Sequence, residues 1–466
     1  MRDKKVQTRN NLNDLTYDDM RRPGIIGRLV YIFEQVVPDP FVLSIGLTFI
    51  VVLLAAIFAP NRSVPTILDS WYDGVFAILG FTAQMILMLA TGYVVADAPA
   101  IRKGLSLLAS RVTTPTHAVL LVFPVVAVAA WLNWALGLVV AAFLSREIGR
   151  RTRVDFGWLV AGSFSAWSVC NSGLSSPIPL SQATHANAMN LVDKFTGHVV
   201  PLSETIFAPF VLIPTILVVL VMAAIFVLMH PKGDNVQAYS EPAVTAEPES
   251  HGGTRSSPSS PAARMERSVL GVLVTLVLGV GYLIVTWSKK GFSLDINNTI
   301  LIFFLIGLAL RGSPIAYADA MREGAKQTGS MLLQYPVYGG IMGIMTGTGL
   351  VGVFVKGFVA VANATTLPVW SFLSSLIITF LVPSAGGHWA VQGPFVVPAA
   401  LSLHASVARS AMGVAMAENV SNMLQPFWAV PIVVMAGVRL QRVMGYTAIT
   451  FVVSLVIYIS ALFLVP

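Results

Sequence analysis

The sequence predicts an all-α polytopic membrane protein with about nine transmembrane helices and two opposed re-entrant hairpins in an inverted repeat. Three observations carry this prediction. The 466 residues are 55% hydrophobic and only 11% charged, whereas roughly a quarter of a soluble domain is charged. Two apolar stretches, each longer than one span, are interrupted by polar and small residues. A weak self-similarity at an offset of about 250 residues indicates a duplicated unit.

Nine apolar windows are long enough to cross a hydrocarbon core of about 30 Å, which needs about 20 helical residues. They begin near Phe41, Gly74, Phe156, Ser203, Ser268, Asn297, Thr328, Arg409 and Val443. The net charge of +7 is dispersed over the connections between the apolar stretches and forms no single basic stripe. We therefore expect membrane lipid around the chain and no nucleic-acid partner.

Two further apolar stretches, about 118–144 and 367–400, exceed one span. The first is interrupted between Asn133 and Gly137, and the second between Pro383 and His388. Pro and paired Gly end helices, and irregular backbone at membrane depth needs protein or a water-filled cavity to satisfy its polar groups. Each stretch could therefore be one kinked crossing or one re-entrant hairpin.

The distribution of Lys and Arg favours hairpins, because a crossing moves every later loop to the other side, whereas a hairpin moves none. With two hairpins, 23 of the 29 basic residues fall inside and five outside, with Arg409 at a boundary. With two crossings the split is only 16 against 12. We expect the hairpins to enter from opposite faces of an inner (plasma) membrane, with the N-terminus cytoplasmic and the C-terminus outside.

The predicted domain order follows from these spans. Residues 1–28, with seven Lys or Arg, form a cytoplasmic tail; 29–230 form the first membrane repeat, and 267–466 form the second. Between them, 231–266 hold five Pro and six Ser and predict a flexible cytoplasmic linker. Inverted repeats with broken helices that meet near the midplane are where secondary transporters bind substrates and coupling ions.

The candidate substrate site lies at the hairpin tips and in the polar middles of the apolar segments that follow them. No Lys or Arg lies deep within a predicted span, so a small carboxylate would need helix N-termini and neutral donors. Helices that begin after Trp134 and Gly387 are expected to present free amides between the tips. The alternative is that the tips are only packed helix breaks. The candidate residues are Asn133, Gly137, Asn171, Ser172, Ser384, Gly386, Gly387, His388, Gln392 and Asn422.

Glu418 is the single acidic residue near the centre of a predicted span, where a carboxylate is costly and is by default a functional candidate. We expect it, with Asn419 and Gln425, either to carry a coupled proton or to bind Na⁺. A structural role bonded to a neighbouring helix is the alternative. His388 could titrate near neutral pH, but a tip histidine is about as often structural. No cofactor beyond this coupling ion is expected.

Two other features are expected to be structural. The single cysteine, Cys170, lies in an apolar segment and is expected to be a small apolar filler. Gly339, Gly343 and Gly347 form a small-xxx-small stripe that permits close helix packing. That stripe could instead be a sliding surface between a scaffold and a moving domain.

Three motifs carry a family resemblance. They are Asn133-Trp-Ala-Leu-Gly-Leu-Val-Val140 running into Arg146-Glu147, the run Val382-Pro-Ser-Ala-Gly-Gly-His-Trp-Ala-Val-Gln-Gly-Pro-Phe-Val-Val-Pro398, and Gln425-Pro-Phe-Trp-Ala-Val-Pro431. With these, the chain resembles the short-chain fatty acid transporter family, within a superfamily of ion-coupled carriers. The resemblance spans all but the tail and the linker. It implies symport of acids such as acetoacetate and butyrate by an elevator motion, in a bacterial inner membrane and in a homodimer. In Glu418-Asn-Val-Ser-Asn422 the family more usually has Trp between the acid and the Asn, a departure that bears on substrate size or coupling.

Other functions remain as alternatives. A related carrier could move a dicarboxylate, an aminobenzoyl-glutamate-like compound or cations against protons, but a second substrate carboxylate should need a buried Arg. A channel is a further alternative, because opposed re-entrant segments can line a pore. An enzyme is not expected, because the sequence has no His-Glu-x-x-His or Gly-x-Ser-x-Gly motif, and it has no Walker loop for an ATP-driven pump.

Overall fold

The computed structural model describes residues 38–231, 236–239, 260–436 and 438–466. All regular elements in these ranges are helices, as the sequence predicts. The predicted cytoplasmic tail, 1–28, and most of the predicted linker, 231–266, lie outside the described residues.

Six helical segments among the described residues are long and apolar enough to cross a membrane. A seventh is formed if α16 (Gly329–Gly347) and α17 (Leu350–Val361), which meet at 78°, count as one span. These findings support a multi-pass membrane protein, and the count of nine crossings stays a prediction. The six are α2 (Pro40–Phe58), α3 with α4 (Val64–Ala77 and Leu79–Ala96), α6 (Pro115–Leu132), α11 (Pro209–Met229), α12 with α13 (Pro261–Glu266 and Val269–Lys290) and α22 (Leu440–Leu464).

Two of the predicted windows are broken helices. The window at Phe156 holds α8 (Phe156–Trp167), a 3-10 turn η1 (Cys170–Ser172) and α9 (Pro177–Gln182). The window at Arg409 holds α20 (Val407–Ser421) and α21 (Pro426–Ala436). Proline lacks an N–H and is favoured at the first helical position, so Pro177 and Pro426 each start a new helix after the break.

Both predicted hairpin stretches are helix–turn–helix units. The first joins α6 to α7 (Trp134–Arg151), and the second joins α18 (Leu367–Leu381) to α19 (Ala385–Ser402). Across the first turn, a Cβ added to Gly137 would lie 2.5 Å from Ala130 Cα. Across the second, Ser375 Oγ donates to Gln392 Oε1 at 2.7 Å. The helices therefore fold back on each other, and their re-entry into a bilayer stays a prediction.

The order of elements recurs along the chain. Helices that begin at residues 79, 99, 115, 134, 156 and 177 are followed about 250 residues later by helices that begin at 329, 350, 367, 385, 407 and 426. The helix that begins at residue 99 is α5 (Pro99–Ala109). This spacing matches the offset seen in the sequence.

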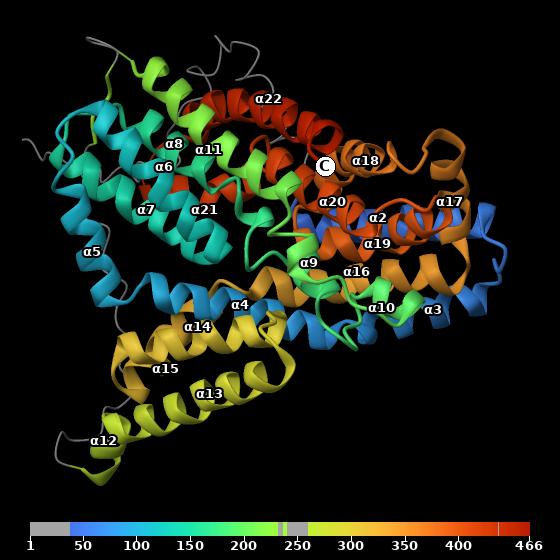
Figure 1. Cartoon of the computed structure of the whole chain (residues 1–466), viewed down its shortest axis with the longest axis horizontal. Helices are drawn as coiled ribbons and strands as arrows, with labels where there is room; N and C mark the ends of the chain where they lie inside the picture. The colour runs from blue at the N-terminus through green and yellow to red at the C-terminus, as the bar shows by residue number, and fades with distance from the viewer. Residues whose placement is uncertain (1–37, 232–235, 240–259, 437) are drawn as a thin grey trace, which may run out of the picture.

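The helices lie on two sides of α4 (Figure 1). α13, α14 (Ile296–Arg311) and α15 (Pro314–Lys326) lie along one side of α4, and α6, α7, α8, α11 and α22 lie on its other side. The short α10 (Leu191–Thr196) and η2 (Leu202–Glu204) connect α9 to α11.

The glycine stripe on α16 lies against α3. A Cβ added to Gly339 would lie 2.5 Å from the carbonyl oxygen of Gly74, and one added to Gly343 would lie 2.1 Å from that of Ser70. Only glycine permits this backbone approach, so the stripe joins α16 to α3. This contact favours the structural interpretation of the stripe over a sliding surface.

Candidate substrate and ion site

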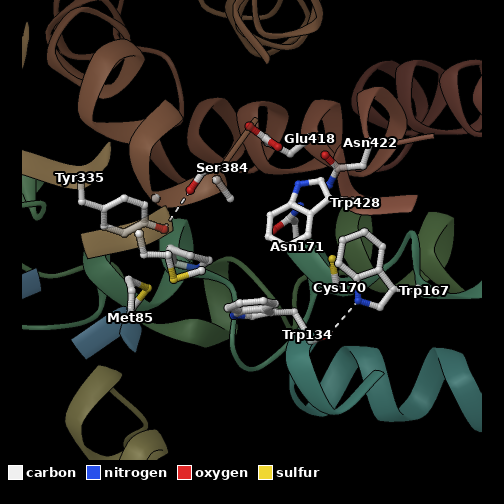
Figure 2. A pocket seen from close by; sticks show the side chains of 14 residues that line it. Met85, Trp134, Trp167, Cys170, Asn171, Tyr335, Ser384, Glu418, Asn422 and Trp428 are labelled. Atoms are coloured by element: carbon white, nitrogen blue, oxygen red, sulfur yellow. Dashed lines mark hydrogen bonds between the residues drawn. The ribbon is translucent and has the colours of Figure 1, made fainter. Parts of the chain in front are cut away.

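A narrow cavity lies where the starts of α7 and α19 and the interrupted ends of α8 and α20 meet α4 and α16 (Figure 2). Its volume is about 30 Å³, which is room for about one or two water molecules. Its lining residues are Met85, Trp134, Trp167, Cys170, Asn171, Pro177, Met331, Tyr335, Ser384, Ala385, Gly386, Glu418, Asn422 and Trp428.

The cavity has a polar side and an apolar side. Figure 2 shows Ser384 and Glu418 above the cavity, and Met85 and Trp134 below it. The lining residues include one carboxylic acid, Glu418, and no Lys or Arg among the described side chains. This arrangement suits a small ligand with one polar end and a short apolar body.

The start of α19 offers unused backbone donors to the polar side. Ser384 precedes the helix, but its side chain does not cap it; Ser384 Oγ instead bonds Tyr335 Oη at 2.8 Å. The amides of Ala385, Gly386 and Gly387 have no acceptor among the described residues. The free amides expected at the second tip are therefore present; a helix N-terminus with free N–H groups attracts an anion, and binding of a carboxylate there stays a prediction.

The start of α7 has no free amides, so the prediction of free amides at this tip is wrong. Asn133 Oδ1 accepts the amides of Ala135 and Leu136 at 2.9 and 3.1 Å. The amide of Trp134 donates to Ser175 Oγ at 2.8 Å. These side-chain oxygens cap α7 completely, so Asn133 is a capping residue behind the cavity wall. The two hairpin tips are therefore chemically unequal.

Glu418 is fully buried and has one engaged and one free oxygen. Its Oε1 bonds His388 Nδ1 at 2.6 Å. Its Oε2 has no hydrogen-bond partner among the described residues, and the side chain borders the cavity. A buried polar atom without a partner is costly, so this free oxygen calls for an explanation.

The surrounding hydrogen bonds hold the ring of His388 on both sides. Gln392 Nε2 donates to the carbonyl of Ser371 at 2.9 Å, so Gln392 Oε1 faces and accepts from His388 Nε2. The hydroxyl of Thr379 donates to a backbone carbonyl at 2.7 Å and can therefore only accept from His388 Nδ1, 3.2 Å away. His388 is therefore held between Glu418 on its Nδ1 side and Gln392 on its Nε2 side, in a buried hydrogen-bonded chain that ends at the cavity.

Other predicted residues hold the breaks together. Asn419 Oδ1 accepts the amide of Asn171 at 2.8 Å, and Asn419 Nδ2 donates to Ser172 Oγ at 2.9 Å. Gln425 Nε2 donates to the carbonyl of Thr379 at 2.7 Å. Asn419 thus joins the two broken helices directly. Of the predicted residues, five line the cavity: Asn171, Ser384, Gly386, Glu418 and Asn422.

Replacing Asn419 with alanine is expected to lower the free energy of unfolding by about 2 kcal/mol, because the buried amide of Asn171 would lose its acceptor. Thermal unfolding in detergent measures this change. Asn61 is the control, because it is exposed and its side chain makes no hydrogen bond to the described residues, so its alanine variant should unfold like the wild type. Equal stabilities of the two variants would contradict the joining role.

Sequence reasoning missed much of the cavity wall. Trp134 and Trp428 lie next to predicted helix breaks, so the sequence could have indicated that they border the site. Cys170, expected to be a filler, is buried but also borders the cavity. Met331 and Tyr335 lie on α16, about 50 residues before the second tip, and nothing in their local sequence marks them.

Known proteins resemble this chain along nearly its whole length. Residues 24–465 match the family described as "Short chain fatty acid transporter". A protein of Escherichia coli (strain K12), provisionally named a short-chain fatty acid transporter, is 35% identical over 443 residues, 94% of this chain and 99% of that protein. A Haemophilus influenzae protein with the same name is 34% identical and covers 92% of this chain and 97% of its own length.

A solved structure shares the fold. The crystal structure of the Alcanivorax borkumensis YdaH transporter, described as having an unusual topology, superposes with a TM-score of 0.59 at 15% identity. The match covers 91% of this chain and 98% of that one. Identity this low shows the fold alone. The family match and the two relatives show more: the chain belongs to the short-chain fatty acid transporter family.

Proposed function

We propose that this protein carries short monocarboxylates, of the acetoacetate and butyrate type, across a bacterial inner membrane by symport with H⁺ or Na⁺. One observation supports this most: the cavity has free helix amides at one side, apolar side chains at the other, and no basic side chain among its described lining residues. A dicarboxylate would place a second charge against the apolar side, where nothing compensates it.

The substrate carboxyl group binds at the start of α19 in this proposal. The free amides of Ala385 and Gly386 and the helix dipole supply positive potential. The Tyr335 and Ser384 hydroxyls, 2.8 Å apart, share one hydrogen bond, so one of them retains a hydrogen for the substrate. The apolar tail then lies against Met85 and Trp134, which face this polar end across the cavity.

The coupling ion follows from charge. A substrate carboxylate in this cavity would share it with the free oxygen of Glu418. Two like charges about 4 Å apart repel by about 4 kcal/mol at an effective dielectric constant of about 20. A proton or a Na⁺ that enters with the substrate removes this repulsion. The unpartnered oxygens of Asn422 and Gln425, on the same broken helix, favour a cation there.

The membrane arrangement is part of the proposal. The hairpins enter from opposite faces, the two repeats are inverted, and the N-terminus is cytoplasmic while the C-terminus is outside. The recurrence of the element order at about 250 residues supports the repeat. The tips and broken helices move together against α4 and α16 in an elevator motion, within a homodimer. In this proposal the 231–266 linker separates the first membrane repeat from the second.

Uptake by the purified protein in proteoliposomes tests the function. Labelled butyrate and acetoacetate should enter saturably and show counterflow, whereas succinate should not. Imposed H⁺ and Na⁺ gradients, applied separately, identify the coupling ion by the one that drives accumulation. Preferred succinate uptake would indicate a dicarboxylate carrier, and unitary currents would indicate a channel.

The single cysteine provides a direct probe of the site. Cys170 borders the cavity, so a small thiol reagent that reaches it should block uptake. Butyrate at about ten times its Kd should slow the modification about tenfold, because the free site becomes that much rarer. The Cys170→Ala variant is the control and should be insensitive to the reagent. A modification rate that does not change with saturating butyrate would place the substrate elsewhere.

A further inference from the structure

Three tryptophans meet around the cavity (Figure 2). Trp134 is the first residue of α7, Trp167 is the last residue of α8, and Trp428 is in the first turn of α21. The ring centroid of Trp428 lies 5.7 Å from that of Trp134 and 5.7 Å from that of Trp167. One hairpin tip and both broken helices therefore contribute to a single aromatic wall.

The three indole N–H groups differ in their partners. Trp167 Nε1 donates to the carbonyl of Trp134 at 2.8 Å, and Trp428 Nε1 donates to the carbonyl of Pro383 at 3.0 Å. Trp134 is only 7% exposed, and its Nε1 is buried without an acceptor among the described residues. An indole nitrogen can only donate, so Trp134 has one hydrogen bond to offer and no protein group that takes it.

A buried donor without an acceptor costs free energy and calls for an explanation. Two of the three equivalent groups in the same wall are satisfied by backbone carbonyls, so the wall is able to satisfy such groups. Trp134 borders the cavity on the side away from Ser384 and Glu418. A ligand held at the start of α19 would therefore bring its other end next to the Trp134 indole.

We infer that Trp134 Nε1 donates to an oxygen on the tail of the substrate. The preferred substrates are then short acids that carry an oxo or hydroxyl oxygen beyond the carboxyl group, and saturated acids of equal length bind less well. This inference rests on the proposed function, because it assigns the carboxyl end to α19. A saturated tail would leave the N–H unpaired, and sites that hydrogen-bond a substrate group discriminate against analogues that lack it.

Competition for uptake of labelled butyrate tests the inference in proteoliposomes. The competitors are butyrate and its 2-, 3- and 4-oxo and hydroxy derivatives, each measured with the wild type and with Trp134→Phe. The best oxygenated acid should bind the wild type about tenfold more tightly than butyrate, because one additional hydrogen bond changes affinity by about that factor. Trp134→Phe should bring this ratio close to one, whatever the change in its affinity for butyrate itself.

Trp428→Phe is the matched control. It removes the same group from the same wall, but its N–H is already bonded to Pro383, so the ratio between oxygenated and saturated acids should stay at the wild-type value. A wild-type ratio near one, or a ratio that survives in Trp134→Phe, would overturn the inference. Absence of uptake of every acid by the folded wild type would instead refute the proposed function.

Discussion

Replacing Glu418 with glutamine is expected to reduce gradient-driven uptake by at least about 100-fold. Glutamine keeps the shape of the side chain but cannot carry a proton or balance a cation. It also replaces the oxygen that bonds His388 Nδ1 at 2.6 Å in a fully buried site. Leaving a buried polar group unpaired costs about 1–3 kcal/mol, and more for a charged group, which adds to the effect. Initial rates with imposed H⁺ and Na⁺ gradients measure it.

A surface glutamate is the control for this substitution. Glu323 pairs with Lys326 at 2.6 Å, and both side chains are more than half exposed, so Glu323→Gln should transport normally. Counterflow without a gradient separates coupling from binding: a variant that exchanges labelled acid but no longer accumulates it has lost coupling alone. Full accumulation by Glu418→Gln with unchanged ion dependence would remove Glu418 from the mechanism.

Replacing Gly343 with alanine is expected to destabilise the protein by about 3 kcal/mol, at the upper end of the usual range for overpacking. The added methyl group would lie 2.1 Å from the carbonyl oxygen of Ser70 and 2.8 Å from Gly74 Cα. These atoms belong to the backbone of α3, which cannot rotate away as a flexible side chain can. Thermal unfolding in detergent, together with the yield of folded protein, measures the loss.

Gly352 offers the matched comparison. It lies in α17, and a Cβ added there would meet nothing within 4 Å. Because alanine favours a helix over glycine by about 1 kcal/mol, Gly352→Ala should be neutral or slightly stabilising. If Gly343→Ala were as stable as Gly352→Ala, the close contact between α16 and α3 would not contribute to folding.

Local chemistry explains why the helix breaks could be predicted. Pro177 and Pro426 lack the N–H that a continuous helix needs, and the polar runs at Asn133 and at Ser384 to His388 interrupt both hairpins where expected. The same reasoning overestimated the number of free amides at the start of α7. Asn133, a preferred N-cap residue, accepts two of them, and Ser175, more than 40 residues away in sequence, accepts the third. The local cap could have been read from the sequence, but the contact with Ser175 could not.

The sequence by itself determined that the chain lies in a membrane, because its charge content is too low for a soluble domain and its apolar runs are long enough to cross a bilayer. It also determined where the helices break and that one acid, Glu418, lies near the centre of a span. Only the tertiary structure decided that this acid pairs with His388, that Asn419 bonds Asn171 across 248 residues, and that α16 supplies Tyr335 to the cavity. Apolar runs and helix breaks are properties of neighbouring residues. Contacts between distant side chains depend on how helices pack, which neither periodicity nor composition records.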